Sequence, residues 1–573
     1  MTQENITDTK TYTGSEILMR ALIDNGVDTI FGYPGGAIMP VYDTLYDYRD
    51  RLNHILVRHE QAAAHAAEGY ARASGKVGVC LVTSGPGVTN TVTGVADAMM
   101  DSTPIVVIAG QVGAAVLGTD AFQECDVVNM MQPVSKWAYQ IRRTEDIALA
   151  VSRAFYIASS GRPGPVVLDF AKNAQTASAP YIPQQISFIR SYVPVPPTEE
   201  GTIEEAAALI NGARKPLVLV GHGVEIAGAE EELKAFIEKA DAPAGCTLLG
   251  LSVLPTDHPL NQGMLGMHGS LALNKLTQQC DVLIAVGMRF DDRITGNLST
   301  YARQAKVVHF EIDRSEVNKN VQTDVAVLGD CRETLAKVTA LLHQQDHSEW
   351  RKAFEPYHEE ENRVVRAPQE HPAEGPLRMG EVVNRVGEIT RGEAICVTDV
   401  GQNQMMGARY SRFARPRSII TSGGMGTMGF GLPAAIGATF GAPDRTVCLF
   451  LGDGGLQMTI EEFGTIMEHR CPVKIVLLNN NYLGNVRQWQ EIFFRRRYSF
   501  TPMLNPDYEK IAEAYRIPVR TVTEREDLDS AIREMLATPG AFLLQCAIKE
   551  EDNVMPMVFP GHDVDDVVLT TDN

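Results

Sequence analysis

Two side chains in the last third of the chain have the types and spacing needed to bind a metal ion. Asp453 follows the apolar run 447–451 within Gly452-Asp453-Gly454-Gly455, and Asn480 follows the apolar run 473–478, 27 residues later. If both runs are parallel strands, a carboxylate and an amide oxygen meet at one edge of a sheet, where they suit Mg²⁺. Such a metal could bridge two phosphates. Two ordinary turns are the alternative, because Asp, Gly and Asn are common in turns.

Glu60 is a candidate for proton transfer and not for metal binding. It follows the strand-like residues 54–57 within Arg58-His59-Glu60-Gln61. A carboxylate in an apolar pocket has a raised pKa and can exchange a proton near neutral pH. The alternative is an exposed charge favoured by the dipole at a helix start. Taken alone, Arg293 within RFDDR is expected to pair with Asp291 or Asp292 at the surface, although the planar fork of an arginine also suits a carboxylate.

Short apolar runs that end in turns must position these residues. Runs of this length, rich in Val, Ile and Leu, are typical of parallel strands buried on both faces. Helical patterns lie between them, and the first begins with the capping-box spacing of Thr13 and Glu16 and stops near Gly26. The alternation predicts α/β doubly wound parallel-sheet domains. The predicted strands are 77–83, 105–110, 166–170, 217–221, 282–287, 307–312, 395–400, 447–451, 473–478 and 542–548.

Length and composition predict three such domains. A chain of 573 residues is too long for one core, and residues 176–200 and 344–377, which contain several prolines, look like linkers. We therefore expect domains at 11–178, 198–343 and 376–551, followed by a C-terminal tail at 552–573.

Charge and cysteine content exclude other classes of protein. A net charge of −20 leaves no basic excess for a nucleic-acid backbone. The nine cysteines are scattered without a C-x-x-C pair, which favours a reducing compartment such as the cytoplasm. Residues 418–443 carry no charge, but their seven glycines favour a loop-rich core segment over a membrane span. The N-terminal residues show no apolar signal segment.

The motifs resemble those of thiamine-diphosphate enzymes, in which GDG is followed by NN. Over nearly its whole length the chain further resembles the catalytic subunits of the acetohydroxyacid synthase (acetolactate synthase) family. The supporting stretches are FGYPGGAIMPVYD at 31–43, RHEQAAAHAAEGYARASG at 58–75, LVTSGPGVTN at 81–90, DAFQECD at 120–126, GRPGPVVLDFAK at 161–172, GMHG at 266–269, GMRFDDRITGN at 287–297, GGMGTMGFGLPAAIGA at 423–438 and GNVRQWQ at 484–490.

The resemblance implies that the third domain binds the diphosphate and metal. Asp453, Asn480 and the backbone carbonyl of Tyr482 would ligate the metal. Met428 would force the cofactor into its bent shape, although core packing is the commoner fate of methionine. Asn403 and Asn485 stand where many relatives have His and Met, so contacts at those loops are open. The other cofactor contacts implied are Gly401, Gln402, Gly424, Met425, Gly426, Gly452, Gly454, Gly455, Leu483 and Gly484.

The resemblance also implies that the first domain binds the pyrimidine ring. Glu60 would share a proton with that ring and so help remove the proton of the thiazolium carbon. Gly36, Phe122, Gln123 and Lys172 would line the reaction space. In the family, Glu60 and the diphosphate site belong to different subunits, which implies a homodimer or a tetramer made of two dimers. A small regulatory subunit is a further expected partner.

The central domain would hold FAD that takes up no net electrons. No G-x-G-x-x-G motif supports this, although an acid at a strand end suits ribose hydroxyls. Arg293 would bind the second substrate's carboxylate, while Trp489, Val486 and Met267 would line its channel, with simple core packing as the alternative for Trp489. The flavin contacts implied are Arg162, Gly266, Met267, His268, Gly287, Arg289, Asp291, Glu311, Asp313 and Asp330.

The expected reaction is decarboxylation of pyruvate and joining of the remaining two carbons to pyruvate or 2-ketobutyrate. The products are 2-acetolactate or 2-aceto-2-hydroxybutyrate, precursors of branched-chain amino acids. A flavin-redox relative such as pyruvate oxidase, or a flavin-free degradative acetolactate synthase, would share GDG…NN but lack the RFDDR and RQWQ pair. A non-catalytic interaction protein with this fold is disfavoured by intact Glu60, Asp453 and Asn480.

Overall fold

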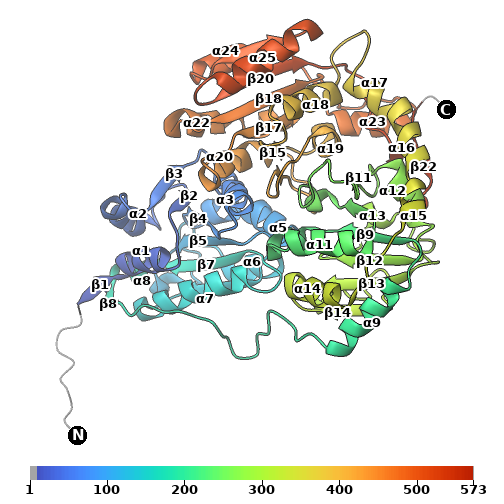
Figure 1. Cartoon of the computed structure of the whole chain (residues 1–573). Coiled ribbons are helices and arrows are strands. Elements are labelled where there is room, and N and C mark those ends of the chain that lie inside the picture. Colours follow the sequence, from blue (N-terminus) through green and yellow to red (C-terminus); the bar gives the residue numbers. More distant parts are fainter. Residues whose placement is uncertain (1–9, 572–573) are drawn as a thin grey trace. The chain divides into compact units, whose positions relative to one another are not determined.

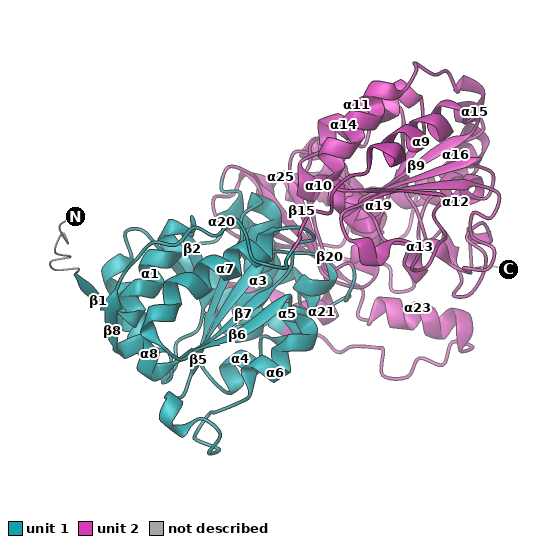
Figure 2. Cartoon of the chain, turned by 90° about the horizontal axis from the view of Figure 1, so that it is seen from below, with its two compact units in different colours: residues 1–192, 424–443, 459–471 teal, residues 193–423, 444–458, 472–573 magenta. Residues whose placement is uncertain are grey.

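Three six-stranded parallel sheets form the framework of the protein, as strand–helix alternation predicts. The structure is a computed structural model that describes residues 10–571 (Figure 1). Its contacts divide it into two units, coloured separately in Figure 2. Unit 1 comprises the chain up to Tyr192 with 424–443 and 459–471, and unit 2 comprises 193–423, 444–458 and 472–571. The central and third sheets therefore belong to one unit.

The sheet of unit 1 has the strand order β3-β2-β4-β5-β7-β6. Helix α1 begins after Thr13, which forms the expected capping box with Glu16, and the chain leaves it through Gly26 at φ +80°. The strands are β2 (Thr29–Gly32), β3 (Asn53–Leu56), β4 (Gly78–Val82), β5 (Ile105–Gln111), β6 (Trp137–Ile141) and β7 (Val166–Ala171). Strands β1 (Thr11–Thr13) and β8 (Ser178–Pro180) form a separate two-stranded sheet. The helices are α1 (Gly14–Asp24), α2 (Met39–Leu45), α3 (Glu60–Ser74), α4 (Pro86–Thr89), α5 (Val92–Met100), α6 (Val127–Met131), α7 (Ile147–Ser159) and α8 (Lys172–Thr176).

Helix α20 (Gly431–Gly441) crosses α3 within unit 1, although it comes from a distant part of the sequence (Figure 2). A Cβ at Gly69 would lie 2.0 Å from the Ala434 carbonyl oxygen, and one at Gly437 would lie 1.8 Å from that of Ala66. Only glycine permits so close a helix crossing. The uncharged segment 418–443 is thus buried over most of its length, although part of its loop 423–428 is exposed. Among residues 10–571 no helix is both long and apolar enough to cross a membrane. Helix α22 (Phe463–His469) also belongs to unit 1.

The central sheet in unit 2 has the order β11-β10-β9-β12-β13-β14. Its strands are β9 (Pro216–Val220), β10 (Ala244–Cys246), β11 (Asn261–Met264), β12 (Val282–Val286), β13 (Lys306–Glu311) and β14 (Val325–Leu328). Its helices are α9 (Glu200–Asn211), α10 (His222–Ala227), α11 (Glu230–Ala240), α12 (Leu271–Thr277), α13 (Asp292–Thr295) and α14 (Cys331–Leu341).

The third sheet has the order β16-β15-β17-β18-β20-β19. Its strands are β15 (Ile395–Thr398), β16 (Ile419–Ile420), β17 (Val447–Gly452), β18 (Val473–Asn479), β19 (Val519–Val522) and β20 (Phe542–Ala547). The helices of this part in unit 2 are α18 (Met379–Ile389), α19 (Gln402–Tyr410), α21 (Asp453–Thr459), α23 (Gly484–Phe493), α24 (Tyr508–Ala514) and α25 (Arg525–Ala537).

Two segments differ from what composition indicates. Residues 344–377, expected to be a linker, are largely helical, in α15 (Ser348–Lys352), α16 (Glu355–Glu361), a π-helical turn (Asn362–Arg366) and α17 (Ala367–Glu370). Trp350 and Phe354 of this segment are buried in the core of unit 2, which outweighs its charge and prolines. The expected tail folds back as β21 (Met557–Val558) and β22 (Val567–Val568). All nine cysteines are free.

Candidate functional site

In each of the three sheets, strand addition switches from one side of a central strand to the other, and most of the candidate residues lie near that point. In such open α/β sheets, ligands bind beyond the carboxyl ends of the strands at this switch point. The reversal falls between β2 and β4 in unit 1, between β9 and β12 in the central sheet, and between β15 and β17 in the third sheet.

In the third sheet, the chain leaves β15 through Gly401 and β17 through the Gly452-Asp453 pair. Gly401 has φ +129°, a conformation that L side chains rarely adopt. A Cβ at Gly455 would lie 2.2 Å from Asp399 Oδ2, so the two turns pack backbone against side chain. Gly454 lies in the first turn of α21. The glycines therefore leave open backbone at the switch point, where a diphosphate could approach.

The two metal candidates lie on neighbouring strands, as predicted. Gly452 pairs with Leu478, so Asp453 and Asn480 leave the sheet at the same edge. Asn480 is buried and donates from Nδ2 to Gln402 Oε1 at 3.3 Å, while its Oδ1 accepts the Tyr482 N–H at 3.3 Å. A Cβ at Gly484 would lie 2.1 Å from Gln402 Oε1 and 2.9 Å from Asn480 Nδ2. The loop past Leu483 thus needs glycine to keep Gln402 and Asn480 in contact.

The surroundings of Asp453 fit a bound cation. Its side chain is 1% exposed, and its Oδ1 has no hydrogen-bond partner among residues 10–571. Burial raises the pKa of Asp453, against the opposing effects of the Asn505 amide and nearby backbone N–H groups. A buried, uncompensated carboxylate oxygen is costly unless a cation or donor meets it. Together with the Asn480 amide oxygen after the adjoining strand, this carboxylate offers oxygen ligands of the kind that Mg²⁺ prefers.

The central sheet presents three close glycines at its switch point. A Cβ at Gly221, after β9, would lie 2.2 Å from the carbonyl oxygen of Gly287, after β12. Gly287 has φ +57°, and the Gly223 N–H donates to its carbonyl at 2.9 Å. Sequence reasoning singled out Gly287 but missed Gly221 and Gly223, whose signal is a strand followed by Gly-His-Gly. The glycines thus allow the turns after β9 and β12 to pack backbone against backbone at the edge of the sheet where ligands of such folds bind.

Several predicted flavin residues cap the helices at that same edge. Asp291, Asp313 and Asp330 accept backbone N–H groups at the starts of their helical turns, and Glu311 accepts those of Ile312 and Asp313. Such capping is a complete structural role by itself, so any ribose contact would be additional. Arg289 stands between β12 and α13 and lies near enough to Asp291 to lower that carboxyl's pKa, although burial raises it overall.

The GMHG segment lies against the predicted substrate arginine. Gly266 has φ +99°, and a Cβ there would lie 2.5 Å from the Arg293 carbonyl oxygen. The Met267 N–H donates to that oxygen at 2.7 Å, and Met267 O accepts the Val558 N–H at 2.8 Å. His268 is buried, which lowers its pKa to about 4 and keeps the ring neutral near pH 7.

Arg293 and Trp489 border neighbouring hollows in unit 2. A small cavity of about 70 Å³ is lined by Met267, Arg293 and Phe559, and a hollow of about 770 Å³ is lined by Val486 and Trp489 together with Asn485. The ring centroids of Trp489 and Phe493 are 5.2 Å apart, and those of Phe493 and Phe559 are 5.1 Å apart. This chain of rings connects the two hollows. The Arg293 side chain is 59% exposed and lies 3.6 Å from Asp292, so the surface ion pair considered as its alternative is present.

In unit 1, Glu60 is the first residue of α3. Its Oε2 accepts a hydrogen bond from Asn90 Nδ2 at 2.9 Å, and a Cβ at Gly87 would lie 3.6 Å from its Oε1. The preceding turn is held by Glu462, whose Oε1 accepts the N–H groups of Arg58 and His59 at 2.9 and 3.0 Å. Sequence reasoning missed both Asn90 and Glu462, because each acts through contacts far along the chain.

Other predicted residues of unit 1 surround the same switch point. Lys172 Nζ donates to Gly36 O at 3.3 Å, and a Cβ at Gly85 would lie 2.9 Å from the carbonyl oxygen of Gln123. Gln123 itself has φ +60°, while the neighbouring Phe122 is 87% exposed. Arg162, in contrast, lies at the amino ends of the strands and not at the switch point: it precedes β7 and donates from Nε at 2.9 Å to the Oγ of Ser102, which precedes β5.

The loop 424–430 also belongs to unit 1, whereas the metal candidates Asp453 and Asn480 belong to unit 2. The Gly424 N–H donates to Asp101 Oδ1 at 2.6 Å, and Gly426 has φ +68°. Met425 is 48% exposed and Met428 is half-buried, so both retain surface for a ligand.

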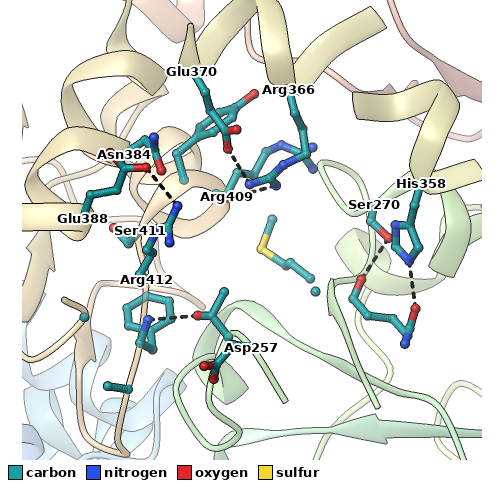
Figure 3. A pocket seen from close by; sticks show the side chains of 18 of the residues that line it. Asp257, Ser270, His358, Arg366, Glu370, Asn384, Glu388, Arg409, Ser411 and Arg412 are labelled. Atoms are coloured by element: carbon teal, nitrogen blue, oxygen red, sulfur yellow. Dashed lines mark hydrogen bonds and ion pairs between the residues drawn. The ribbon is translucent and has the colours of Figure 1, made fainter. Parts of the chain in front are cut away.

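A separate cavity of about 700 Å³ lies between β11, α16, α18 and the end of α19 in unit 2 (Figure 3). No predicted site residue lines it. Its charged side chains are largely matched in ion pairs, Arg366 with Glu370 at 2.6 Å and Arg412 with Glu388 at 3.0 Å. The deepest arginine, Arg409, pairs with buried Glu361 and donates to the His268 carbonyl at 2.6 Å. These pairs join α19 to the GMHG segment.

Three family models match the chain at these same parts of the sequence. They are the N-terminal TPP binding domain (residues 12–130), the central domain (203–338) and the C-terminal TPP binding domain (399–546) of thiamine pyrophosphate enzymes. Together they cover more than half of the chain. The fold and the candidate site thus define a thiamine pyrophosphate enzyme.

Similar proteins narrow this class. The chain is 44% identical to acetolactate synthase isozyme 2 large subunit of Escherichia coli, over 96% of this chain and 98% of that protein. It is 41% identical to the acetolactate synthase large subunit of Lactococcus lactis, over 98% and 96%, and 41% identical to isozyme 3 large subunit of E. coli, over 97% and 98%. The chain belongs to the family of acetolactate synthase large subunits.

Proposed function

We propose that this protein is an acetolactate synthase that decarboxylates pyruvate and joins the two-carbon remainder to a second 2-keto acid. The products are 2-acetolactate from a second pyruvate and 2-aceto-2-hydroxybutyrate from 2-ketobutyrate. Thiamine diphosphate, when bound, supplies the carbanion chemistry for loss of carbon dioxide and formation of the new bond. The observation that carries the proposal is the meeting of Asp453 and Asn480 at adjoining strand ends, in a chain of this family.

The roles proposed for single residues follow from their surroundings. Asp453, Asn480 and the Tyr482 carbonyl would hold Mg²⁺, because Asp453 has a buried oxygen without a hydrogen-bond partner among residues 10–571 and Asn480 follows the adjoining strand. Glu60 would hold and move a proton at its Oε1, which Asn90 leaves accessible by binding Oε2. Arg293 would bind the acceptor's carboxylate through its exposed guanidinium.

Product analysis tests the activity. The protein is incubated with pyruvate and 2-ketobutyrate in the presence of thiamine diphosphate, Mg²⁺ and FAD, and both acetohydroxy acids are quantified. We expect both products from the unchanged protein and neither from Asp453→Ala, which should also fail to retain thiamine diphosphate. Acetate or acetyl phosphate formation with electron transfer to an acceptor would instead indicate an oxidase.

We further propose a homodimer in which Glu60 of one subunit serves the metal site of the other. Support comes from the resemblance of the motifs that carry Glu60 and Asp453 to those of the family. Co-assembly of two inactive variants, Glu60→Gln and Asp453→Ala, provides a test. A shared site predicts about a quarter of wild-type activity, since half of the dimers are mixed and each holds one intact site. No recovery in proven mixed dimers would place both residues in one chain's site.

Two further partners complete the proposal. FAD would lie beyond the carboxyl ends of the central sheet's strands, near its switch point, as a bound group that takes up no net electrons. A smaller regulatory subunit is proposed because the relatives are named large subunits. The reducing cytoplasm is the proposed location, in keeping with nine free cysteines.

A further inference from the structure

One amide side chain outside the recognised motifs connects the strand ends that carry the metal candidates. Asn505 lies in the loop between α23 and α24. Its Nδ2 lies 2.6 Å from Asp453 Oδ2, 3.0 Å from Asn479 Oδ1 and 3.1 Å from Asn481 Oδ1. Asp453 follows β17, Asn479 is the last residue of β18 and Asn481 lies just beyond it, so a single amide group holds both strand ends together.

The amide of Asn505 is itself held from the other side. Its Oδ1 accepts hydrogen bonds from Gln457 Nε2 at 2.9 Å and from the Tyr508 hydroxyl at 3.2 Å. Tyr508 is buried and its hydroxyl also lies 3.3 Å from the Asp453 carbonyl oxygen. The orientation of the amide is therefore fixed, with Nδ2 toward the carboxylate.

The same loop supports the third metal candidate through its backbone. The Leu483 N–H donates to Thr501 O at 2.9 Å, and the Met503 N–H donates to Asn481 O at 2.8 Å. Tyr482 forms an isolated antiparallel bridge with Pro502 between these two bonds. Residues 501–503 thus hold the stretch from which the Tyr482 carbonyl is presented.

We propose that Asn505 is a positioning residue for the metal ion, an inference that rests on the proposed function of Asp453. By occupying Oδ2, Asn505 leaves the buried Oδ1 of Asp453 as the atom that can ligate. A neutral amide suits this task, because it adds no positive charge that would compete with the cation. Groups that hydrogen-bond a metal ligand typically contribute about 10–100-fold to metal affinity.

The test measures metal binding directly, in the full-length protein with thiamine diphosphate present. Isothermal titration with Mg²⁺ and the electron paramagnetic resonance spectrum of bound Mn²⁺ are recorded for the unchanged protein, Asn505→Ala and Asn505→Ser. We expect Asn505→Ala to raise the dissociation constant by about 10–100-fold and Asn505→Ser by less, since serine retains a donor. Activity lost at low Mg²⁺ should return at saturating Mg²⁺.

Two comparison variants separate the possible failures. Leu504→Ala, at the fully exposed neighbouring position, should bind Mg²⁺ with unchanged affinity. Asp453→Ala should lose binding altogether, and normal binding by that variant would overturn the proposed metal site itself. If Asp453→Ala loses the metal but both Asn505 variants bind it with wild-type affinity, only the role of Asn505 is overturned. The positioning role of Asn505 is also contradicted if its variants lose activity that saturating Mg²⁺ does not restore.

Discussion

Replacement of Glu462 by Gln should alter how the stability of unit 1 depends on pH. Glu462 is fully buried, and its two oxygens accept hydrogen bonds from the N–H groups of Arg58 and His59 and from the Thr465 hydroxyl at 2.6 Å. Burial raises its pKa to about 7, although these hydrogen bonds act in the opposite direction. Glutamine keeps the shape and an acceptor for both N–H groups but removes the ionisation.

The direction and size of this pH effect follow from the coupling between proton binding and folding. An acid with a raised pKa in the folded state contributes its full stability below the unfolded value of 4.5, and that contribution falls as pH rises through about 7. A shift of this size corresponds to about 3 kcal/mol in the free energy of unfolding. The free energy of unfolding of Glu462→Gln, relative to that of wild type, should therefore rise by about 3 kcal/mol between pH 4.5 and pH 8.

Urea unfolding at a series of pH values provides the assay. Trp137 is the only tryptophan of unit 1, so its fluorescence reports that unit when Trp350 and Trp489 are replaced by Phe. Glu468→Gln is the control, because its ion pair with Arg58 is partly exposed and should contribute under about 1 kcal/mol at any pH. Parallel pH profiles for wild type and Glu462→Gln would refute the reasoning.

Four further outcomes are expected. Glu60→Gln should bind thiamine diphosphate in calorimetry yet lose activity by roughly 10²–10⁴-fold, and wild-type proton exchange at the thiazolium carbon would contradict its role. Trp489→Leu should keep acetolactate formation but lose most preference for 2-ketobutyrate in a competition assay, since one methylene is worth about 1–3 kcal/mol; an unchanged product ratio would make the tryptophan simple packing. Glu361→Ala should lower the free energy of unfolding by about 3–5 kcal/mol, because Arg409 would remain buried without its partner; wild-type urea unfolding would show otherwise. Flavin should co-purify with the protein, its removal should stop activity, and a redox-inert analogue should restore it, whereas a need for an electron acceptor would indicate redox chemistry.

The sequence by itself determined the elements and the residues at their ends. The ten predicted strands are present with small changes at their limits, because buried parallel strands are continuous apolar runs that end in glycine or asparagine turns. The capping box at Thr13 and Glu16 is local chemistry and is found as predicted. Asp453, Asn480 and Glu60 could be selected for the same reason, since each directly follows a recognisable strand or opens a helix.

Only the tertiary structure decided what surrounds those residues. Asn505 and Glu462 act on groups 52 and 404 residues away along the chain, and no local pattern indicates such contacts. Short strands such as β10, β11 and β16 owe their pairing to neighbouring strands, and they lie at or near sheet edges where the sequence is not continuously apolar. Residues 344–377 read as a linker from charge and proline, but burial of Trp350 and Phe354 against unit 2 makes them helical core. Packing between distant segments is a property of the folded chain, and it decided which side chains support the site.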